Sequence, residues 1–329
     1  DHVSMVGFKY PTLPFRELLA DRLRALYDPR SDPQTVAREL QIVGVELAGS
    51  LPPDLVKLLR RGNIRNLMLR HDDEFDFPLE LCYLDDSKDP FFVGDRIAVC
   101  RWYLGATSLP DVVEKTVRKV AFLRGSTEAF RADEALLERL FPGRITGFGC
   151  RSEIIEQVFK TSRFDIIHFT GHCRQKDKAS GGLELENGDF LRLIEIGQLE
   201  AERAFAAARP FIMLNACSSV QPYLGLTQRG SFAHRFVGSR ACAVVGTLWP
   251  VASDVANEFA ERFYQELRAK PIGQALLDAK IALVGKPVNQ NEHNANSLHQ
   301  LARQVAVRSY CLFANPDLRL VGHSLEKEI

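Results

Sequence analysis

Two short apolar runs that break abruptly into small and polar residues constrain the fold of this chain more than any other feature. One run covers residues 164–169 and leads to His172, and the other covers residues 211–214 and leads to Cys217. Short apolar runs that end in glycine or polar residues are typical of buried parallel strands. Open α/β sheets carry their chemistry at the carboxyl edge of such strands. We therefore expect His172 and Cys217 to meet at that edge of one sheet.

From residue 117 onward, strand-like segments alternate with helix-like segments. This alternation predicts an α/β fold with a mostly parallel sheet and helices on both faces. The Asn187-Gly188 pair between alternating residues also predicts a β-hairpin. The predicted strands cover residues 117–123, 145–149, 164–169, 211–215, 241–248 and 310–313. The predicted helices cover residues 132–140, 152–161, 196–208, 228–237, 253–268, 272–285 and 296–307.

Residues 1–110 follow a different pattern, in which helices come first. Leucines at helical spacing predict a helix over residues 19–27, and Pro33 predicts the first turn of a second helix. Strands are predicted at residues 64–69, 77–84 and 97–103, and a linker at 109–111. We therefore divide the chain into an N-terminal helical and strand appendage, residues 1–110, and an α/β domain, residues 111–329.

Charge and hydropathy argue against two classes of partner. The formal net charge is zero, and no cluster of Lys and Arg with interleaved aromatic residues is present, so we expect no direct nucleic-acid partner. No apolar run approaches the roughly 18 to 20 residues that cross a bilayer, so we expect no membrane partner. The 46% hydrophobic content is ordinary for a globular protein.

The seven cysteines are scattered, and none forms a Cys-x-x-Cys pair. Their odd number and spacing argue against a disulfide framework and against a structural zinc site. Cys82, Cys100, Cys242 and Cys311 stand among apolar residues, where a thiol behaves as a small hydrophobe. These features favour a reducing, cytoplasmic setting.

Cys217 and His172 are the candidate reactive pair. A thiolate is the nucleophile of cysteine chemistry, and a neighbouring imidazole acts as general base toward the thiol and general acid toward the leaving amine. From the residues alone, an ordinary buried cysteine is an equally good interpretation of Cys217. His168 and Asn215 lie within the apolar runs, and we expect both to be buried, hydrogen-bonded residues.

The motifs together resemble a known family. The pattern His-x-x-Gly-His ends at His172, a polar hairpin follows, and Leu-Asn-Ala-Cys-Ser then contains Cys217. In this order and spacing the chain resembles the CHAT family of caspase-like cysteine peptidases over about residues 64 to 322. The appendage from about residue 64 then corresponds to that family's pseudo-caspase-like part. Further matching segments are residues 77–81, 91–96, 244–251, 263–264 and 312–316.

The resemblance implies a caspase-like fold and hydrolysis of peptide bonds in a protein substrate through an acyl-enzyme on Cys217, with no metal or organic cofactor. It assigns the general base and acid to His172, the second histidine of the motif. The main-chain N–H groups of Cys173 and Cys217 would hold the oxyanion. Cys173 stands where the family often has glycine, so the backbone is less free at this position.

The resemblance also implies a biological setting, namely regulated action in bacterial signalling or antiviral defence. A gasdermin-like pore former is the expected substrate, and an activating sensor protein or domain the expected partner. The chain starts at Asp1 and not at methionine, so we expect further domains to be missing from it. The loops at 173–182 and 218–227 are expected to shift on activation.

A candidate substrate-binding segment follows the apolar strand that begins at Ala241. In Thr247-Leu248-Trp249, the main chain would pair with an extended peptide and the indole would form an apolar wall; packing of Trp249 in the core is the alternative. Asp254 would favour a basic substrate side chain, or else cap the helix that starts there.

Two rival functions remain open at this stage. One is a catalytically silent CHAT-like scaffold that binds partners, which the presence of both His172 and Cys217 argues against. The other is an α/β hydrolase or transferase that acts on a small molecule, but the chain lacks Gly-x-Ser-x-Gly and phosphate-loop motifs. A zinc site on His168 and His172 is disfavoured because their context is a strand and not a helix.

Overall fold

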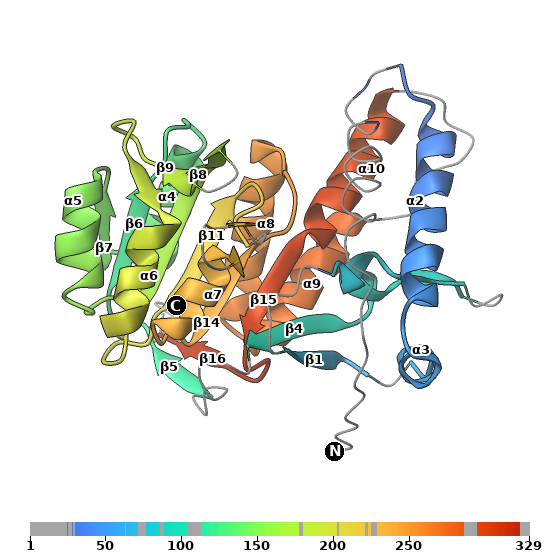
Figure 1. Ribbon diagram of the computed structural model, residues 1–329, viewed down its shortest axis with the longest axis horizontal. Helices are drawn as coiled ribbons and strands as arrows, with labels where there is room; N and C mark the ends of the chain where they lie inside the picture. The colour runs from blue at the N-terminus through green and yellow to red at the C-terminus, as the bar shows by residue number, and fades with distance from the viewer. Residues whose placement is uncertain are drawn as a thin grey trace, which may run out of the picture.

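A mixed sheet of ten strands runs through the computed structural model and carries helices on both faces (Figure 1). Eight of these strands follow the order β1-β4-β15-β14-β11-β8-β6-β7, and β9 and β10 extend from β8 as a hairpin. This count refers to the described residues, which are 25, 28, 30–62, 64–71, 77–85, 89–103, 113–177, 180–202, 204–220, 223–224, 229–285 and 295–322.

The central strands are buried from end to end because helices cover both faces of the sheet. Every residue of β11, β14 and β15 is buried, as their nearly unbroken apolar sequences predict. Pairing is parallel throughout the eight-strand order except between β14 and β15, which are antiparallel. The strands are β1 (Asn66–His71), β4 (Ala98–Tyr103), β6 (Val120–Arg124), β7 (Ile145–Phe148), β8 (Ile166–Asp177), β9 (Ser180–Glu184), β10 (Phe190–Arg192), β11 (Phe211–Ala216), β14 (Ala243–Thr247) and β15 (Tyr310–Ala314).

Two apolar clusters form the core, one on each face of the sheet. Helices α4 (Phe130–Leu140), α8 (Ser253–Leu267) and α9 (Ile272–Val284) pack on one face. The other face is covered mainly by α2 (Pro33–Gly49), α3 (Pro53–Arg60), the π-helical turn η3 (Ile154–Phe159), α6 (Leu193–Glu202) and α7 (Phe232–Gly238). The short helix α5 (Arg151–Glu153) leads into η3 and has no buried residue. Helix α10 (Ala295–Arg308) contributes to both clusters. The predicted α/β fold with helices on both faces is confirmed.

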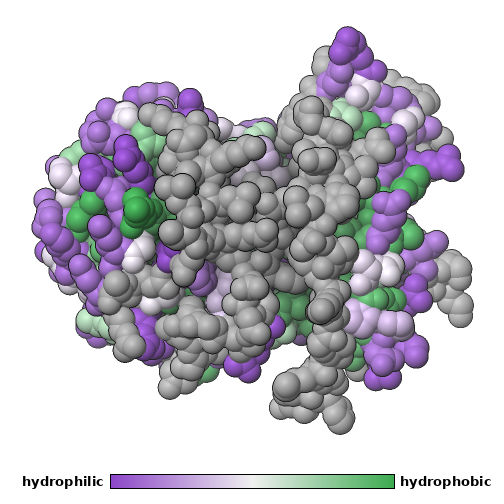
Figure 2. All heavy atoms as spheres, in the orientation of Figure 1, coloured by the Kyte–Doolittle hydropathy of each residue, from purple (hydrophilic) through white to green (hydrophobic). Residues whose placement is uncertain are grey.

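The surface carries isolated apolar spots. Figure 2 shows mainly hydrophilic side chains on the coloured part of one face, with separate apolar spots between them. The large exposed apolar residues include Ile42 and Val45 on α2 and Ile194 on α6. Within the described ranges, no helix combines the length and the apolar character that crossing a bilayer requires.

The N-terminal part joins the same sheet. Helix α2 begins at Pro33, as predicted, and Asp32 caps it by accepting a 2.9 Å hydrogen bond from the Thr35 N–H. Strand β4 pairs with β15, so the sheet runs across the predicted division at residue 110. The strand predicted at 77–84 is wrong for most of its length, because a 3₁₀ turn, η1 (Leu79–Leu81), precedes a two-residue strand, β2 (Tyr83–Leu84). The predicted helix at 19–27, apart from Ala25, and the linker at 109–111 lie outside the described residues.

Shorter elements complete the fold. Strand β2 pairs with β3, and η2 follows directly, while β5 pairs with β16 and β12 with β13. Their bounds are β3 (Phe91–Phe92), η2 (Val93–Asp95), β5 (Glu114–Thr116), β12 (Tyr223–Leu224), β13 (Arg229–Gly230) and β16 (Arg319–Val321).

A fully buried ion pair links η1 to the sheet. The Arg101 guanidinium of β4 donates to both carboxylate oxygens of Glu80, at 2.6 and 2.7 Å, and to the Phe77 carbonyl at 3.1 Å. Burial disfavours the Glu80 charge, but the charge of Arg101 and its hydrogen bonds lower the pKa of Glu80 below its ordinary value. Burial also lowers the pKa of nearby Lys280. The Cys311 thiol of β15 donates to Glu80 at 3.5 Å, so Glu80 also connects the N-terminal part of the chain to β15 near its C-terminus.

Strand β8 is longer than the sequence predicts. It continues to Asp177 and pairs antiparallel with β9, with His172 opposite Glu184. The strand therefore does not end near residue 169 as predicted, and much of the predicted loop at 173–182 belongs to a β-hairpin. Gly171 allows close packing, because a Cβ at this position would lie 2.7 Å from the Gly125 Cα. The hairpin predicted around Asn187-Gly188 is confirmed by the β9–β10 pairing.

Candidate active site

The two candidate reactive residues follow directly on paired positions of neighbouring parallel strands. Strands β8 and β11 run in register up to Gly171 opposite Ala216; His172 is the next residue of β8, and Cys217 directly follows the end of β11. The expected adjacency of these strands is confirmed. Side chains two residues apart on a strand share a face. His168, Thr170 and His172 therefore lie on the face that α4 and α8 cover.

His172 and Cys217 line one pocket with a volume of about 60 Å³. This is enough room for a few water molecules or a small side chain. Its walls come from the middle of β8, the ends of β11 and β14, the segment just before α4 and the start of α8. The other lining residues are Thr127, Ala129, Thr170, Gly171, Asn215, Ala216, Thr247, Val251, Ser253, Ala256, Asn257 and Tyr310.

The Cys217 thiol is half-buried and contacts the main chain of Val251, just before α8. The Val251 N–H points at the sulfur at 3.5 Å, and the Val251 carbonyl oxygen lies 3.5 Å from the same sulfur. An N–H donor directed at Sγ is the contact that a thiolate would accept. The adjacent Ser218 has φ 53°, an uncommon value for a residue other than glycine. The turn after Cys217 therefore holds a sparsely populated backbone conformation.

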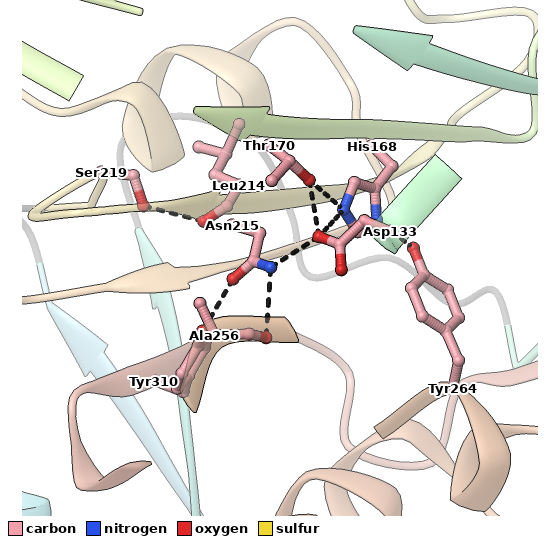
Figure 3. Close-up of polar contacts among 9 residues, drawn as sticks. All are labelled: Asp133, His168, Thr170, Leu214, Asn215, Ser219, Ala256, Tyr264 and Tyr310. Atoms are coloured by element: carbon pink, nitrogen blue, oxygen red, sulfur yellow. Dashed lines mark hydrogen bonds and ion pairs between the residues drawn. The ribbon is translucent and has the colours of Figure 1, made fainter. Parts of the chain in front are cut away.

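Thr247 and Ser219 fix the end of the strand that leads to Cys217. The Thr247 hydroxyl donates to the Ala216 carbonyl at 2.7 Å, and the Thr247 N–H donates to the Ser219 hydroxyl at 3.1 Å. The Ser219 hydroxyl donates in turn to the Leu214 carbonyl at 3.1 Å (Figure 3). The Thr247 and Ser219 hydroxyl groups therefore link the end of β11 to β14 and to the turn that follows Cys217.

A buried polar network lies beneath the pocket and is centred on Asp133 of α4 (Figure 3). One carboxylate oxygen, Oδ2, accepts from the Thr170 hydroxyl at 2.6 Å and from the Asn215 side-chain amide at 2.7 Å, and the His168 Nε2 lies 3.1 Å away. The other oxygen, Oδ1, is buried and has no hydrogen-bond partner among the described residues.

Two tyrosine hydroxyl groups complete this network. Tyr264 meets His168 Nδ1 at 2.9 Å, and Tyr310 donates to the Asn215 Oδ1 at 2.7 Å. Burial, together with the Asp133 charge, raises the pKa of both tyrosines well above the ordinary value, so both hydroxyls stay protonated. The predictions that His168 and Asn215 are buried and hydrogen-bonded are confirmed.

The predicted oxyanion donors occupy different settings. Cys217 follows the last residue of β11, whereas Cys173 is a strand residue paired opposite Leu183 of β9. The Cys173 side chain is half-buried and packs against one of the two core clusters. Its role as an oxyanion donor stays a prediction.

Of the predicted substrate-binding residues, the structure brings only Thr247 to the pocket. Trp249 is 4% exposed, lies in the core and donates its indole N–H to the Val305 carbonyl at 3.2 Å. The Leu248 N–H donates to the Ser309 carbonyl at 3.0 Å, so it is already engaged within the chain. Asp254 is exposed in the first turn of α8; the prediction that it caps this helix is wrong, because the N-cap is Ala252.

Sequence reasoning missed Asp133, Thr170, Tyr264 and Tyr310. Two of them had a detectable signal. Thr170 shares the strand face of His172 by the two-residue period. Asp133 falls on the buried stripe of α4 with Phe130, Leu136 and Leu137, where a carboxylate is unexpected. The tyrosines had no such signal, because an aromatic residue is ordinary in a buried helix or strand.

This arrangement defines a class: an α/β protein with a histidine and a cysteine at the carboxyl edge of its sheet. The chain belongs to the CHAT domain family, whose model matches residues 24–304. That match covers most of the chain, and it includes both His172 and Cys217. No curated protein sequence matches this chain.

Several solved structures resemble this chain at low sequence identity, and two gingipain structures share its fold. The complex of the pro- and mature domains of Porphyromonas gingivalis RgpB has a TM-score of 0.53 and 12% identity, over 94% of this chain and 78% of that chain. The Arg-specific cysteine proteinase gingipain R has a TM-score of 0.52 and 11% identity, over 83% of this chain and 69% of that one. The Saccharomyces cerevisiae separase–securin complex has a TM-score of 0.46 and 11% identity, over 70% of this chain, which spans 15% of the separase-complex chain.

Proposed function

We propose that this protein is a cysteine endopeptidase in which Cys217 is the nucleophile and His172 the general base and acid. The observation that supports this most directly is the register of β8 and β11, which pairs the residues immediately before them, Gly171 and Ala216. The shared pocket and the Val251 N–H at the sulfur add further support. A catalytically silent scaffold would need neither reactive side chain at this pocket.

In the proposed reaction, His172 takes the thiol proton of Cys217, and Sγ bonds to the carbonyl carbon of the scissile peptide. The carbonyl π electrons move to oxygen, where main-chain N–H groups stabilise the charge. The C–N bond then breaks, and His172 gives its proton to the leaving amine. A water molecule, deprotonated by His172, attacks the thioester. This step releases the carboxylate product and returns the thiol.

Covalent labelling tests the nucleophile. A peptide-type thiol electrophile should modify Cys217 selectively, and Cys217→Ala and His172→Ala should each abolish turnover of a proteome-derived peptide library without unfolding the protein. Cys173→Ala is the matched control, and it should retain substantial activity. Loss of activity in Cys173→Ala, with full activity in Cys217→Ala, would show that Cys217 is not the nucleophile. A folded wild type that cuts no peptide in any condition supports the scaffold instead.

The family resemblance supports a finer proposal about biology. The peptidase acts in the bacterial cytoplasm in antiviral defence, where a sensor protein or domain activates it and a gasdermin-like pore former is its substrate. Co-expression with a gasdermin-like protein should be toxic and should yield a fragment that mass spectrometry maps to one cut. The Cys217→Ala variant should give neither result. Cleavage of library peptides without cleavage of any such protein would refute this part alone.

A further inference from the structure

The Asp133 carboxylate contacts both strands that carry the reactive residues. Its Oδ2 atom accepts from Thr170 on β8 at 2.6 Å and from Asn215 on β11 at 2.7 Å. Thr170 stands two residues before His172, and Asn215 stands two residues before Cys217. Because the strand period is two, Thr170 shares a face of β8 with His172. Asn215, near the end of β11, lines the same pocket as Cys217.

Main-chain pairing between the two strands stops just before these residues. The β8–β11 register ends at Gly171 and Ala216. From His172 onward, β8 pairs with β9 on its other side, while β11 gives way to a turn. The separation of His172 from Cys217 is therefore not fixed by a hydrogen bond of this ladder. The side chain of Asp133 connects the two strands through Thr170 and Asn215, close to His172 and Cys217.

Asp133 also sets the direction of every hydrogen bond in the bridge, because a carboxylate only accepts. The Asn215 amide must turn its Nδ2 toward Asp133, where it also donates to the Ala256 carbonyl at 3.2 Å. Its Oδ1 must then face Tyr310, whose hydroxyl donates to it. The Thr170 hydroxyl hydrogen is committed to Asp133 in the same way. The bridge therefore has a single arrangement of donors and acceptors.

The bridge is dry, which makes it strong and intolerant of loss. Asp133, Thr170 and Asn215 are 1%, 2% and 3% exposed. In such surroundings, hydrogen bonds to a charged acceptor are stronger than bonds between neutral groups. A donor that loses its acceptor at such a buried position cannot hydrogen-bond to water instead, which costs folding free energy.

We propose that Asp133 is a positioning residue, which holds His172 and Cys217 at reactive separation by bridging β8 and β11 through Thr170 and Asn215. This inference rests on the proposed peptidase function. Asp133 touches neither the thiol nor a substrate, so it acts only through the strands. It is the third side chain on which the reaction depends.

Four variants, one of them a control, isolate this role. Asp133→Ala removes the acceptor of both strands. Asp133→Asn keeps the size of the side chain. Its carbonyl oxygen can replace Oδ2 as the acceptor, and its amide nitrogen then takes the position of Oδ1, which has no hydrogen-bond partner among the described residues. Tyr264→Phe is the matched control, because it removes a buried hydrogen bond on the far side of the network, at His168 Nδ1, and leaves the bridge intact. Thr170→Val removes one strand's bond at constant volume, and serves if Asp133→Ala does not fold.

The readouts are steady-state cleavage and alkylation of Cys217 by iodoacetamide at neutral pH. Misplacement of reacting groups by about 1 Å lowers the rate roughly 10²-fold. We expect Asp133→Ala to lower kcat by about this factor with KM within about threefold, and Asp133→Asn to restore most of kcat. Thr170→Val should lower kcat by about five- to tenfold, and Tyr264→Phe should stay near wild type. The part of the alkylation rate that His172→Ala abolishes should fall in parallel.

The outcomes separate this inference from the proposed function. If wild-type Cys217 shows neither cleavage nor alkylation that depends on His172, the peptidase proposal fails. If wild type shows both, but Asp133→Ala or Thr170→Val keeps the kcat of Tyr264→Phe, only the positioning role is overturned. An Asp133→Asn variant as slow as Asp133→Ala would also overturn the positioning role. That role requires only a hydrogen-bond acceptor of this shape between Thr170 and Asn215, and asparagine supplies one.

Discussion

Replacing Arg101 by methionine should cost the protein about 3 kcal/mol of folding free energy. The guanidinium is completely buried, and it meets both oxygens of the equally buried Glu80 at 2.6 and 2.7 Å. Removing one partner of a buried pair typically costs about 3 to 5 kcal/mol, because the remaining charge has no counterpart. We take the lower end because the charge of Lys280 also lowers the pKa of Glu80 and compensates part of the loss.

Equilibrium unfolding in urea, followed by tryptophan fluorescence, measures this cost. Both tryptophans of the chain, Trp102 and Trp249, are buried and should report on the loss of the core. At about 2 °C per kcal/mol for a chain of this size, the thermal midpoint should fall by roughly 6 °C. The double variant Glu80→Leu/Arg101→Met is the control, and it should recover most of the loss because apolar side chains replace both charges. A single variant within about 1 kcal/mol of wild type, or a double variant as costly as the two single changes added together, would refute the reasoning.

Three further predictions concern thiols, a close backbone contact and acid. Burial raises the pKa of Cys100, Cys242 and Cys311 to about 12 and that of Cys82 well above its ordinary value. Mass spectrometry after alkylation at pH 8 should therefore find these four cysteines unmodified in the folded protein. Labelling of Cys311 as fast as that of half-buried Cys150 would contradict this prediction. Gly171→Ala should cost about 1 to 3 kcal/mol in urea unfolding, because its Cβ would lie 2.7 Å from the Gly125 Cα, whereas Gly49→Ala, with nothing within 4 Å, should be neutral; equal effects would speak against the close contact. The folded pKa of Glu80 lies below its unfolded value of about 4.3, so the ionised Glu80 stabilises the folded protein above that pH, and this stabilisation is lost as pH falls through the folded pKa. The difference in unfolding free energy between wild type and Glu80→Gln should therefore narrow in acid. A difference that stays constant with pH would argue against a lowered pKa of Glu80.

The sheet was predictable because its strands are short apolar runs with polar ends. Strands β6, β7, β11, β14 and β15 fall within a few residues of their predicted places. Strand β8 was not predictable in full, since its second half is polar and pairs with β9 only as a hairpin. The 77–84 segment failed for a related reason: Leu79 and Leu81 are buried by a 3₁₀ turn, and apolar residues alone do not separate such a turn from a strand.

The reactive pair was predictable from position, and its surroundings were not. His172 and Cys217 follow apolar runs, so their place at the sheet edge could be inferred. Trp249 shows the limit of this reasoning: its place next to a strand end suggested a pocket wall, but its indole N–H is satisfied by Val305, which is distant in sequence. Asp133 depends on such a distant contact too, since the donors that it meets come from two strands that follow it in the chain.

The place of β15 between β4 and β14 has a consequence for the newborn chain. Residues 98–103 pair with β1 on one side, but they find the partner on their other side only when residues 310–314 have been made. At about 5 to 20 residues per second, a ribosome needs roughly 10 to 40 s to supply it. During that interval β4 lacks this neighbour, and its unpaired side is open to a wrong strand. The same late strand brings Tyr310, which holds the Asn215 amide beneath Cys217. A chain interrupted before that point therefore lacks both the pairing of β4 with β15 and the Tyr310 hydrogen bond beneath Cys217. Under the proposed function, incomplete products of translation should be inactive.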